Sequence, residues 1–238
     1  MLTCVSLTGP DDQTDITALE ALAVKYPFVE WALLYVPHNE GAARNPRQAW
    51  RKAFFEVGMP GTSAVHLCGS QAFNELQKDM LPAEVLKADR LQLNINARRK
   101  EFSDKEVLDI YKRSLDLGPD IILQRHADTA ALIDRFIAGL AVLDTHRVQV
   151  LLDESKGTGC TPEVWRRPES LDGIECGYAG GIGPHNMHQV LPLVAAIHQP
   201  DEPYWLDMES GVRTDNQFDM RKAEAVLAAA AKFVGYPD

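Results

Sequence analysis

The chain has 238 residues, of which 45% are hydrophobic and 24% are charged. This composition is ordinary for a folded globular protein and argues against disorder as the main state. The formal net charge of −10 repels both the nucleic-acid backbone and anionic lipid. We therefore expect neither a nucleic-acid partner nor a membrane partner.

The cysteines and the ends of the chain indicate a cellular location. Cys4, Cys68, Cys160 and Cys176 show no CxxC spacing, and a chain of this length does not need disulfides to fold. No basic start followed by an apolar run marks a signal peptide, and no apolar stretch reaches 18 residues. These features predict a cytoplasmic protein with reduced thiols.

Short β-rich runs alternate with longer helical patterns along the whole chain. The predicted strands are Leu2–Thr8, Val29–Val36, Ser63–Cys68, Leu91–Ile95, Asp120–Arg125, Arg147–Asp153, Glu175–Ala179 and Tyr204–Met208. The predicted helices are Ile16–Lys25, Pro46–Val57, Gln71–Met80, Asp104–Leu117, Thr129–Leu140, Asn186–His198 and Gln217–Phe233. A further helix, with the weakest pattern, is expected around Thr161–Pro168.

Eight strand–helix units at this length predict an α/β protein, a single (β/α)8 TIM barrel formed by residues 1–238 as one domain. An open doubly wound sheet usually has a glycine-rich turn after its first strand, and the turn after Thr8 lacks that pattern. In a barrel of this kind, functional residues gather at the carboxyl ends of the strands.

Three segments near the end of the chain carry residues suited to chemistry. An apolar strand delivers Asp153 at its end, and another delivers Asp207. Between them, Gly180 and Gly181 end a strand, and Ser210 and Gly211 begin the loop after the last strand. Small residues allow backbone N–H groups to approach an anion closely, and barrels commonly bind phosphate in the loops after strands seven and eight. We therefore expect a phosphate site at these two loops.

These segments resemble the phosphoribosylanthranilate isomerase family, the barrel enzymes of tryptophan biosynthesis. The matching pieces are LLDESKGTGCT, YAGGIGPHNM and LDMESGVRTDNQFDMRKAEAVL, with fainter matches in SLTG and LLYVPHNEGAARNP. The resemblance implies an isomerase that performs an Amadori rearrangement without a metal or an organic cofactor. Its partner would be a small phosphorylated sugar substrate, and a homodimer is a candidate assembly.

The resemblance also implies roles for individual residues. Asp153 stands at the position of the general acid, which protonates the ring oxygen of the ribosylamine so that the furanose opens to a Schiff base. Arg44 stands where an arginine holds the anthranilate carboxylate, and Asp207 matches an aspartate near the substrate's amine. Gly180, Gly181, Ser210 and Gly211 match the phosphate-binding turns.

One position departs from the family pattern. The family's general base is a cysteine at the end of the first strand, and Thr8 stands there in this chain. A threonine hydroxyl is not ionised at neutral pH, whereas a thiol can be tuned to ionise there. Cys68 and His126 are the remaining candidates for the base, because Cys4 should lie deeper inside the barrel.

Other polar residues have two interpretations. Glu30, within a buried-looking strand, is either a functional carboxylate or a salt-bridge partner. His185 and His188 lie three residues apart, but without a third ligand we expect no metal site.

Three functions remain open. The chain is an isomerase of phosphoribosylanthranilate type, or a diverged member acting as an aldolase, epimerase or isomerase on another sugar phosphate, or a non-catalytic protein that binds a phosphorylated metabolite. The missing cysteine favours the last two, whereas Asp153 and the phosphate-like loops favour retained ligand binding.

Overall fold

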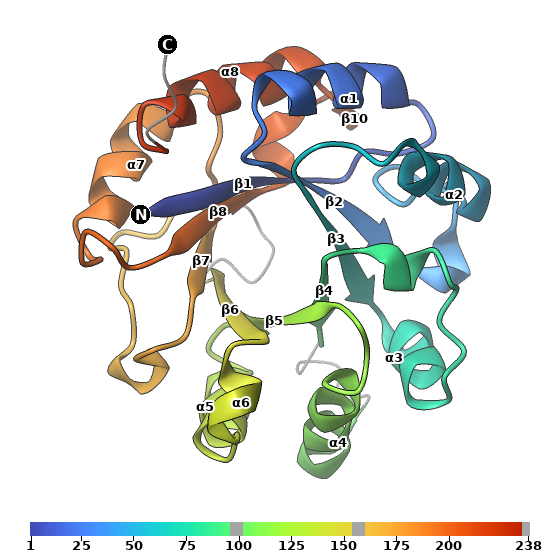
Figure 1. Ribbon diagram of the computed structural model, residues 1–238, viewed down its shortest axis with the longest axis vertical. Coiled ribbons are helices and arrows are strands. Elements are labelled where there is room, and N and C mark those ends of the chain that lie inside the picture. Colours follow the sequence, from blue (N-terminus) through green and yellow to red (C-terminus); the bar gives the residue numbers. More distant parts are fainter. Residues whose placement is uncertain (96–101, 154–159, 235–238) are drawn as a thin grey trace.

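Eight parallel strands close into a barrel in the order of the chain, as predicted (Figure 1). The computed structural model describes residues 1–95, 102–153 and 160–234. The strands are β1 (Leu2–Thr8), β2 (Val29–Tyr35), β3 (Thr62–Cys68), β4 (Arg90–Asn94), β5 (Asp120–Arg125), β6 (Val148–Asp153), β7 (Cys176–Ala179) and β8 (Tyr204–Met208). Pairing of β1 with β8 closes the barrel, so the carboxyl ends of all eight strands surround one mouth.

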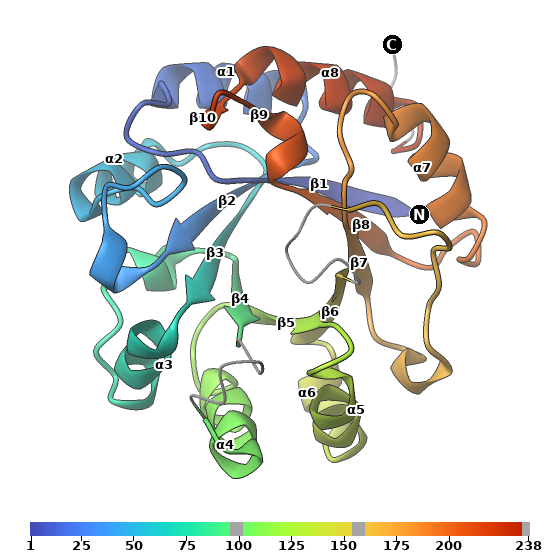
Figure 2. The same ribbon diagram turned by 180° about the vertical axis from the view of Figure 1, so that it is seen from behind.

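Helices form the outer layer around the barrel (Figures 1 and 2). They are α1 (Ile16–Lys25), α2 (Gln48–Val57), α3 (Ser70–Gln77), α4 (Asp104–Ser114), α5 (Ala130–Ala138), α6 (Val142–Thr145), α7 (Met187–Ala195) and α8 (Met220–Ala231). Their apolar faces pack on the outward side chains of the strands, such as Val5, Val65 and Leu206. No helix among the described residues is long and apolar enough to cross a bilayer.

The helix predicted at Thr161–Pro168 is wrong. The described part of the β6–β7 connection is irregular, apart from a short 3-10 turn at Glu169–Leu171. Pro162 and Pro168 bracket this stretch, and the residue before each proline is biased away from helical backbone. Trp165 instead anchors the stretch, because it is buried against Tyr178 of β7.

The last helix also begins later than predicted. Arg213–Thr214 and Gln217–Phe218 form a small antiparallel hairpin, β9 and β10, around a turn at Asp215 and Asn216. Both turn residues have positive φ, which is the backbone of a two-residue hairpin turn. The side chain of Asp219 then accepts hydrogen bonds from the first amides of α8.

In the interior of the barrel, away from the carboxyl ends of the strands, a buried ion pair joins β2 and β4. Glu30 accepts two hydrogen bonds from Arg90, each 2.6 Å long, so Glu30 is a salt-bridge partner. The Arg90 guanidinium lies 4.6 Å from the centre of the Trp205 ring. A Cβ at Gly177 would lie 2.0 Å from that ring, so only glycine leaves room for it. Cys4 is buried in this region, as expected.

Candidate active site at the barrel mouth

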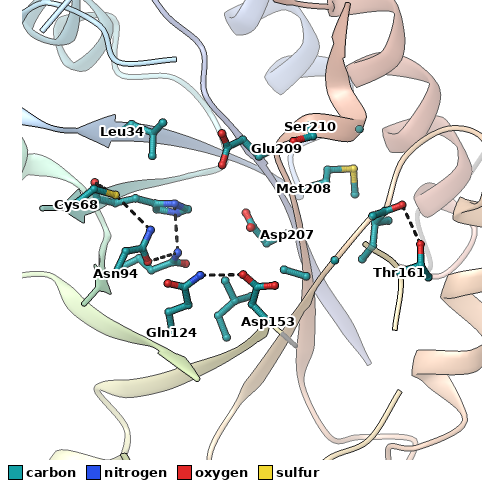
Figure 3. A pocket seen from close by; sticks show the side chains of 18 of the residues that line it. Leu34, Cys68, Asn94, Gln124, Asp153, Thr161, Asp207, Met208, Glu209 and Ser210 are labelled. Carbon is teal, nitrogen blue, oxygen red and sulfur yellow. Dashed lines mark hydrogen bonds between the residues drawn. The ribbon is translucent and has the colours of Figure 1, made fainter. Parts of the chain in front are cut away.

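A cavity of about 440 Å³ opens at the carboxyl ends of the strands (Figure 3). Cys68 and Asn94 lie on one side of it and Thr161 on the other, with Asp153 and Asp207 between them. The lining residues come from seven of the eight strands or the loops that follow them: Leu34, His66, Cys68, Gln92, Asn94, Gln124, Leu151, Asp153, Thr161, Ala179, Gly180, Gly181, Ile182, His185, Asp207, Met208, Glu209, Ser210 and Gly211.

Two buried carboxyl groups project into this cavity. Asp153, the last residue of β6, accepts a 2.9 Å hydrogen bond from the side-chain amide of Gln124. Asp207 on β8 accepts a 2.7 Å hydrogen bond from the Thr8 hydroxyl. Burial raises the pKa of Asp207 to about 7, because the charge is costly to desolvate and the hydrogen bond from Thr8 only partly compensates. Asp207 can therefore exchange a proton near neutral pH.

The turns after β7 and β8 fit against each other through glycine. Gly180 and Gly181 have φ values of 128° and 59°, which favour glycine. A Cβ at Gly211 would lie 1.9 Å from the carbonyl oxygen of Ile182, so any side chain there would push the turns apart. The Asn186 side chain accepts from the Gly183 amide and donates to the Gly181 carbonyl, at 2.9 Å each, which fixes the first turn.

Neutral polar groups form the wall made by β3 and β4. The Gln92 amide nitrogen lies 2.8 Å from Asn94 Oδ1 and 3.3 Å from His66 Nδ1, and Asn94 Nδ2 lies 3.4 Å from Cys68 Sγ. Burial lowers the pKa of His66 to about 4 and raises the pKa of Cys68 to about 12. Both side chains are therefore uncharged at neutral pH, and Cys68 is a poor candidate for a general base.

Most of the predicted site residues meet in this cavity. Its lining includes both predicted aspartates and all four predicted phosphate-loop residues: Asp153, Asp207, Gly180, Gly181, Ser210 and Gly211. Thr8 is buried behind the cavity, where it supports Asp207. The glycine-rich stretch Gly157–Gly159 lies outside the described residues.

Besides Thr8, two predicted site residues do not line the cavity. Arg44 is paired with Glu209, with 2.5 Å between Nη1 and Oε1, and its Nε donates to Asn216. His126 instead borders a separate pocket of about 450 Å³, beside Arg166 and Pro168. The Thr129 hydroxyl accepts a hydrogen bond from the backbone amide of His126, within the turn that leads into α5.

The sequence reasoning assigned no role to several lining residues, and the polar ones among them include His66, Gln92, Gln124 and Glu209. Gln92 stands two residues before Asn94, and His66 two residues before Cys68, so each pair shares a strand face. Polar residues that recur every second position within otherwise apolar strands are the sequence pattern that indicates these inward-facing side chains. His66 and Gln92 lie two residues before the ends of β3 and β4, so a search for polar residues at strand ends alone does not find them.

The arrangement combines three kinds of group around one cavity. Backbone amides of two glycine turns can hold an anion, two carboxyl groups can transfer protons, and a neutral wall can form hydrogen bonds. Within the ranges that the structure describes, no three His, Cys, Asp or Glu side chains are gathered in a way that could hold a metal ion. This combination suits proton transfer on a phosphorylated small molecule.

Comparison with known proteins gives one limited sequence match. A segment of 90 residues is 29% identical to N-(5'-phosphoribosyl)anthranilate isomerase of Methanococcus aeolicus. The match covers 38% of this chain and 38% of that protein. No family model matches the chain.

Comparison of structures covers nearly the whole chain. The N-(5'-phosphoribosyl)anthranilate isomerase of Pyrococcus furiosus aligns with a TM-score of 0.59 and 14% identity, over 97% of this chain and 99% of that one. A phospho-2-dehydro-3-deoxyheptonate aldolase of Thermotoga maritima aligns with a TM-score of 0.54 and 12% identity, over 98% of this chain and 69% of that one. At such identities the likeness concerns the fold alone. The chain is therefore a (β/α)8 barrel that is similar to phosphoribosylanthranilate isomerases in its fold and in one segment of its sequence.

Proposed function

We propose that the chain binds a phosphorylated sugar at the barrel mouth and catalyses an aldose–ketose isomerisation of the Amadori type. The observation that carries the proposal is the meeting of Asp153 and Asp207 with the two glycine turns in one cavity. The relatives named as phosphoribosylanthranilate isomerases support the same class of reaction.

The phosphate is bound by the turns after β7 and β8. Gly180, Gly181 and Gly211 line the cavity and carry no side chains that would keep a phosphate oxygen from the backbone. Hydrogen bonds from backbone amides can stabilise an anion without a net positive charge, which suits a chain of net charge −10. The sugar then extends from these turns toward the two aspartates.

Asp153 and Asp207 divide the proton transfers between them. Asp153 gives a proton to the ring oxygen while the bond between that oxygen and C1 breaks, and the nitrogen lone pair forms the Schiff base. Asp207, in its ionised form, then removes the proton from C2, and the resulting enolamine tautomerises to the aminoketose. Thr8 cannot act as the base, but its hydroxyl holds the Asp207 carboxylate in place.

A turnover assay with phosphoribosylanthranilate tests the reaction. We expect conversion by the wild-type protein, and a loss of at least about a hundredfold in kcat for Asp153→Asn, which keeps the shape but removes the acid. Conversion that survives Asp153→Asn would show that Asp153 is not the acid. No conversion by the wild type would exclude this substrate.

A second candidate is a related reaction on a different sugar phosphate. The observation that favours it is the pairing of Arg44 with Glu209, which leaves Arg44 outside the cavity and away from any aminobenzoate carboxylate. Calorimetric titration with ribose 5-phosphate separates the two candidates. Binding of ribose 5-phosphate without turnover of phosphoribosylanthranilate would favour this second candidate.

A further inference from the structure

The turn between β7 and α7 uses several of its backbone donors within the protein. The Gly183 amide donates to the side-chain oxygen of Asn186 at 2.9 Å. The amides of Asn186 and Met187 both donate to the Gly183 carbonyl oxygen, at 3.1 and 3.0 Å. Pro184 has no N–H to offer. A phosphate held between the turns after β7 and β8 therefore depends on their remaining amides and on donors from side chains.

His185 brings an imidazole to the place where the two turns meet. The residue lines the cavity and is exposed. A Cβ at Gly183 would lie 3.2 Å from Nδ1 of His185 and 3.1 Å from Cα of Gly211. The imidazole is therefore beside the contact between the turns, and a ligand in the cavity can reach it.

The charges around the cavity make a cation at this place important for an anionic ligand. Three carboxyl groups border the cavity: Asp153, Asp207 and Glu209. The described lining includes no lysine or arginine, and Arg44 lies outside it, paired with Glu209. His66 does not supply the charge, because burial lowers its pKa to about 4. An imidazole can gain a proton between about pH 5 and pH 8, and His185 brings one to the turns.

We propose that His185 is a phosphate-binding residue, whose protonated imidazole donates a hydrogen bond to a phosphate oxygen held at the turns after β7 and β8. This inference rests on the proposed sugar-phosphate site and adds a side chain to it. The hydroxyl groups of Thr161 and Ser210 also border the cavity and can donate, but they carry no charge. His185 supplies the charge-assisted hydrogen bond of the site.

A charged imidazole links phosphate binding to proton binding. An anion within a few ångströms favours the protonated form of a histidine, so bound phosphate should favour proton uptake by His185. By the same linkage, His185 strengthens phosphate binding only while it is protonated. Its contribution to phosphate affinity is therefore greater at pH 6 than at pH 8.

A pair of histidine substitutions tests the role of His185. Calorimetry measures the affinity for inorganic phosphate of the wild type and of His185→Ala at pH 6 and at pH 8. We expect His185→Ala to bind phosphate about tenfold more weakly than the wild type at pH 6, and the difference to shrink at pH 8. Comparing the two proteins at each pH cancels the protonation of the phosphate itself. His188→Ala is the matched control, because His188 is exposed on the same helix but does not line the cavity, and its phosphate affinity should equal that of the wild type.

The outcomes separate this inference from the proposed function. If the wild type binds neither inorganic phosphate nor ribose 5-phosphate, the sugar-phosphate site is wrong, and the role of His185 with it. If the wild type binds both and His185→Ala binds phosphate equally well at both pH values, the site stands and only the role of His185 is wrong. An equal loss at pH 6 and pH 8 would overturn the charged form of the contact.

A measurement on the wild type needs no variant to fold. Nitrogen-15 NMR of the imidazole groups at pH 7 should show the His185 signals moving toward those of the protonated ring as inorganic phosphate saturates the protein. The His188 signals should stay in place. His185 signals that do not move at saturation would overturn the assignment.

Discussion

Glu30 and Asp207 are both buried and face the barrel interior at different depths, yet their pKa values are shifted in opposite directions. Burial disfavours the charge on Glu30, yet the neighbouring Arg90 lowers its pKa below the ordinary range. Asp207 is also buried, but it accepts a hydrogen bond from the neutral Thr8 hydroxyl, and burial raises its pKa to about 7. Burial alone therefore does not make a carboxyl group reactive. The decisive difference is whether a cation accompanies it.

The glycines of the barrel interior and of the barrel mouth also differ in what they make room for. Deep in the barrel, Gly177 makes room for the Trp205 ring, which fills the interior. At the mouth, Gly211 makes room for a backbone carbonyl, and the space beside it remains open as part of the cavity. One region is closely packed, whereas the other borders an open cavity.

The largest expected effect is a loss of stability when the buried ion pair of Glu30 and Arg90 is broken. Arg90→Met leaves Glu30 buried without its cation, and we expect a loss of about 3–5 kcal/mol in the free energy of unfolding, measured by urea denaturation at pH 7. The double variant Glu30→Leu/Arg90→Met removes both charges and should recover most of that loss. If the single and double variants are equally unstable, the ion pair is not what Arg90 contributes.

Asp207→Asn tests whether burial raises the pKa of the Asp207 carboxyl group. A carboxyl group whose pKa is raised on folding contributes stability that is present below about pH 4 and is lost as the pH rises through about 7. The shift from 3.8 to about 7 corresponds to at most about 4 kcal/mol. We expect the stability of the asparagine variant relative to the wild type to increase as the pH rises from 4 to 8. Thermal unfolding at several pH values measures this difference. A difference that does not change with pH would contradict the raised pKa.

Gly211→Ala tests the contact between the two turns. Its Cβ would lie 1.9 Å from the Ile182 carbonyl oxygen, which is backbone and cannot swing away. We expect a cost of about 1–3 kcal/mol in stability and at least about a tenfold weaker binding of inorganic phosphate, measured by calorimetry. Gly118→Ala is the control, because nothing lies within 4 Å of a Cβ there. Equal phosphate affinity in both variants would argue against a phosphate site at the turns.

The smallest effect concerns Thr8. Thr8→Val removes the hydroxyl that donates to Asp207 and so favours the protonated carboxyl group. If Asp207 is the base, kcat/KM of the wild type should rise with pH through about 7, and the valine variant should show the same rise displaced upward by about one pH unit. A rise that stays at the same pH would mean that another group controls it.

Sequence reasoning found the barrel because its signal repeats eight times. Each strand combines β-rich composition with a short length, and each carboxyl end faces the same mouth, so Asp153 and Asp207 could be brought together without coordinates. The glycine pairs after β7 and β8 were found for the same reason. The helix predicted at Thr161–Pro168 does not form, because the residues before Pro162 and Pro168 are biased away from helical backbone.

The rest of the site depends on contacts between residues far apart in the chain. Nothing local to Arg44 predicts that Glu209, 165 residues later, takes up its guanidinium. His126 follows a strand, but the turn into α5 carries it to another pocket. The hydrogen-bond chain from Cys68 to His66 requires side chains of β3 and β4 in register, which the pairing of Cys68 with Asn94 provides.

The central claim is that the turns after β7 and β8 bind the phosphate of a sugar phosphate. A titration of nitrogen-15-labelled protein with ribose 5-phosphate, followed in amide NMR spectra, tests it directly. We expect saturable binding, with the largest shifts at the amides of Gly180, Gly181 and Gly211. Saturation that leaves these three amides unmoved, or no binding at millimolar ligand, would contradict it.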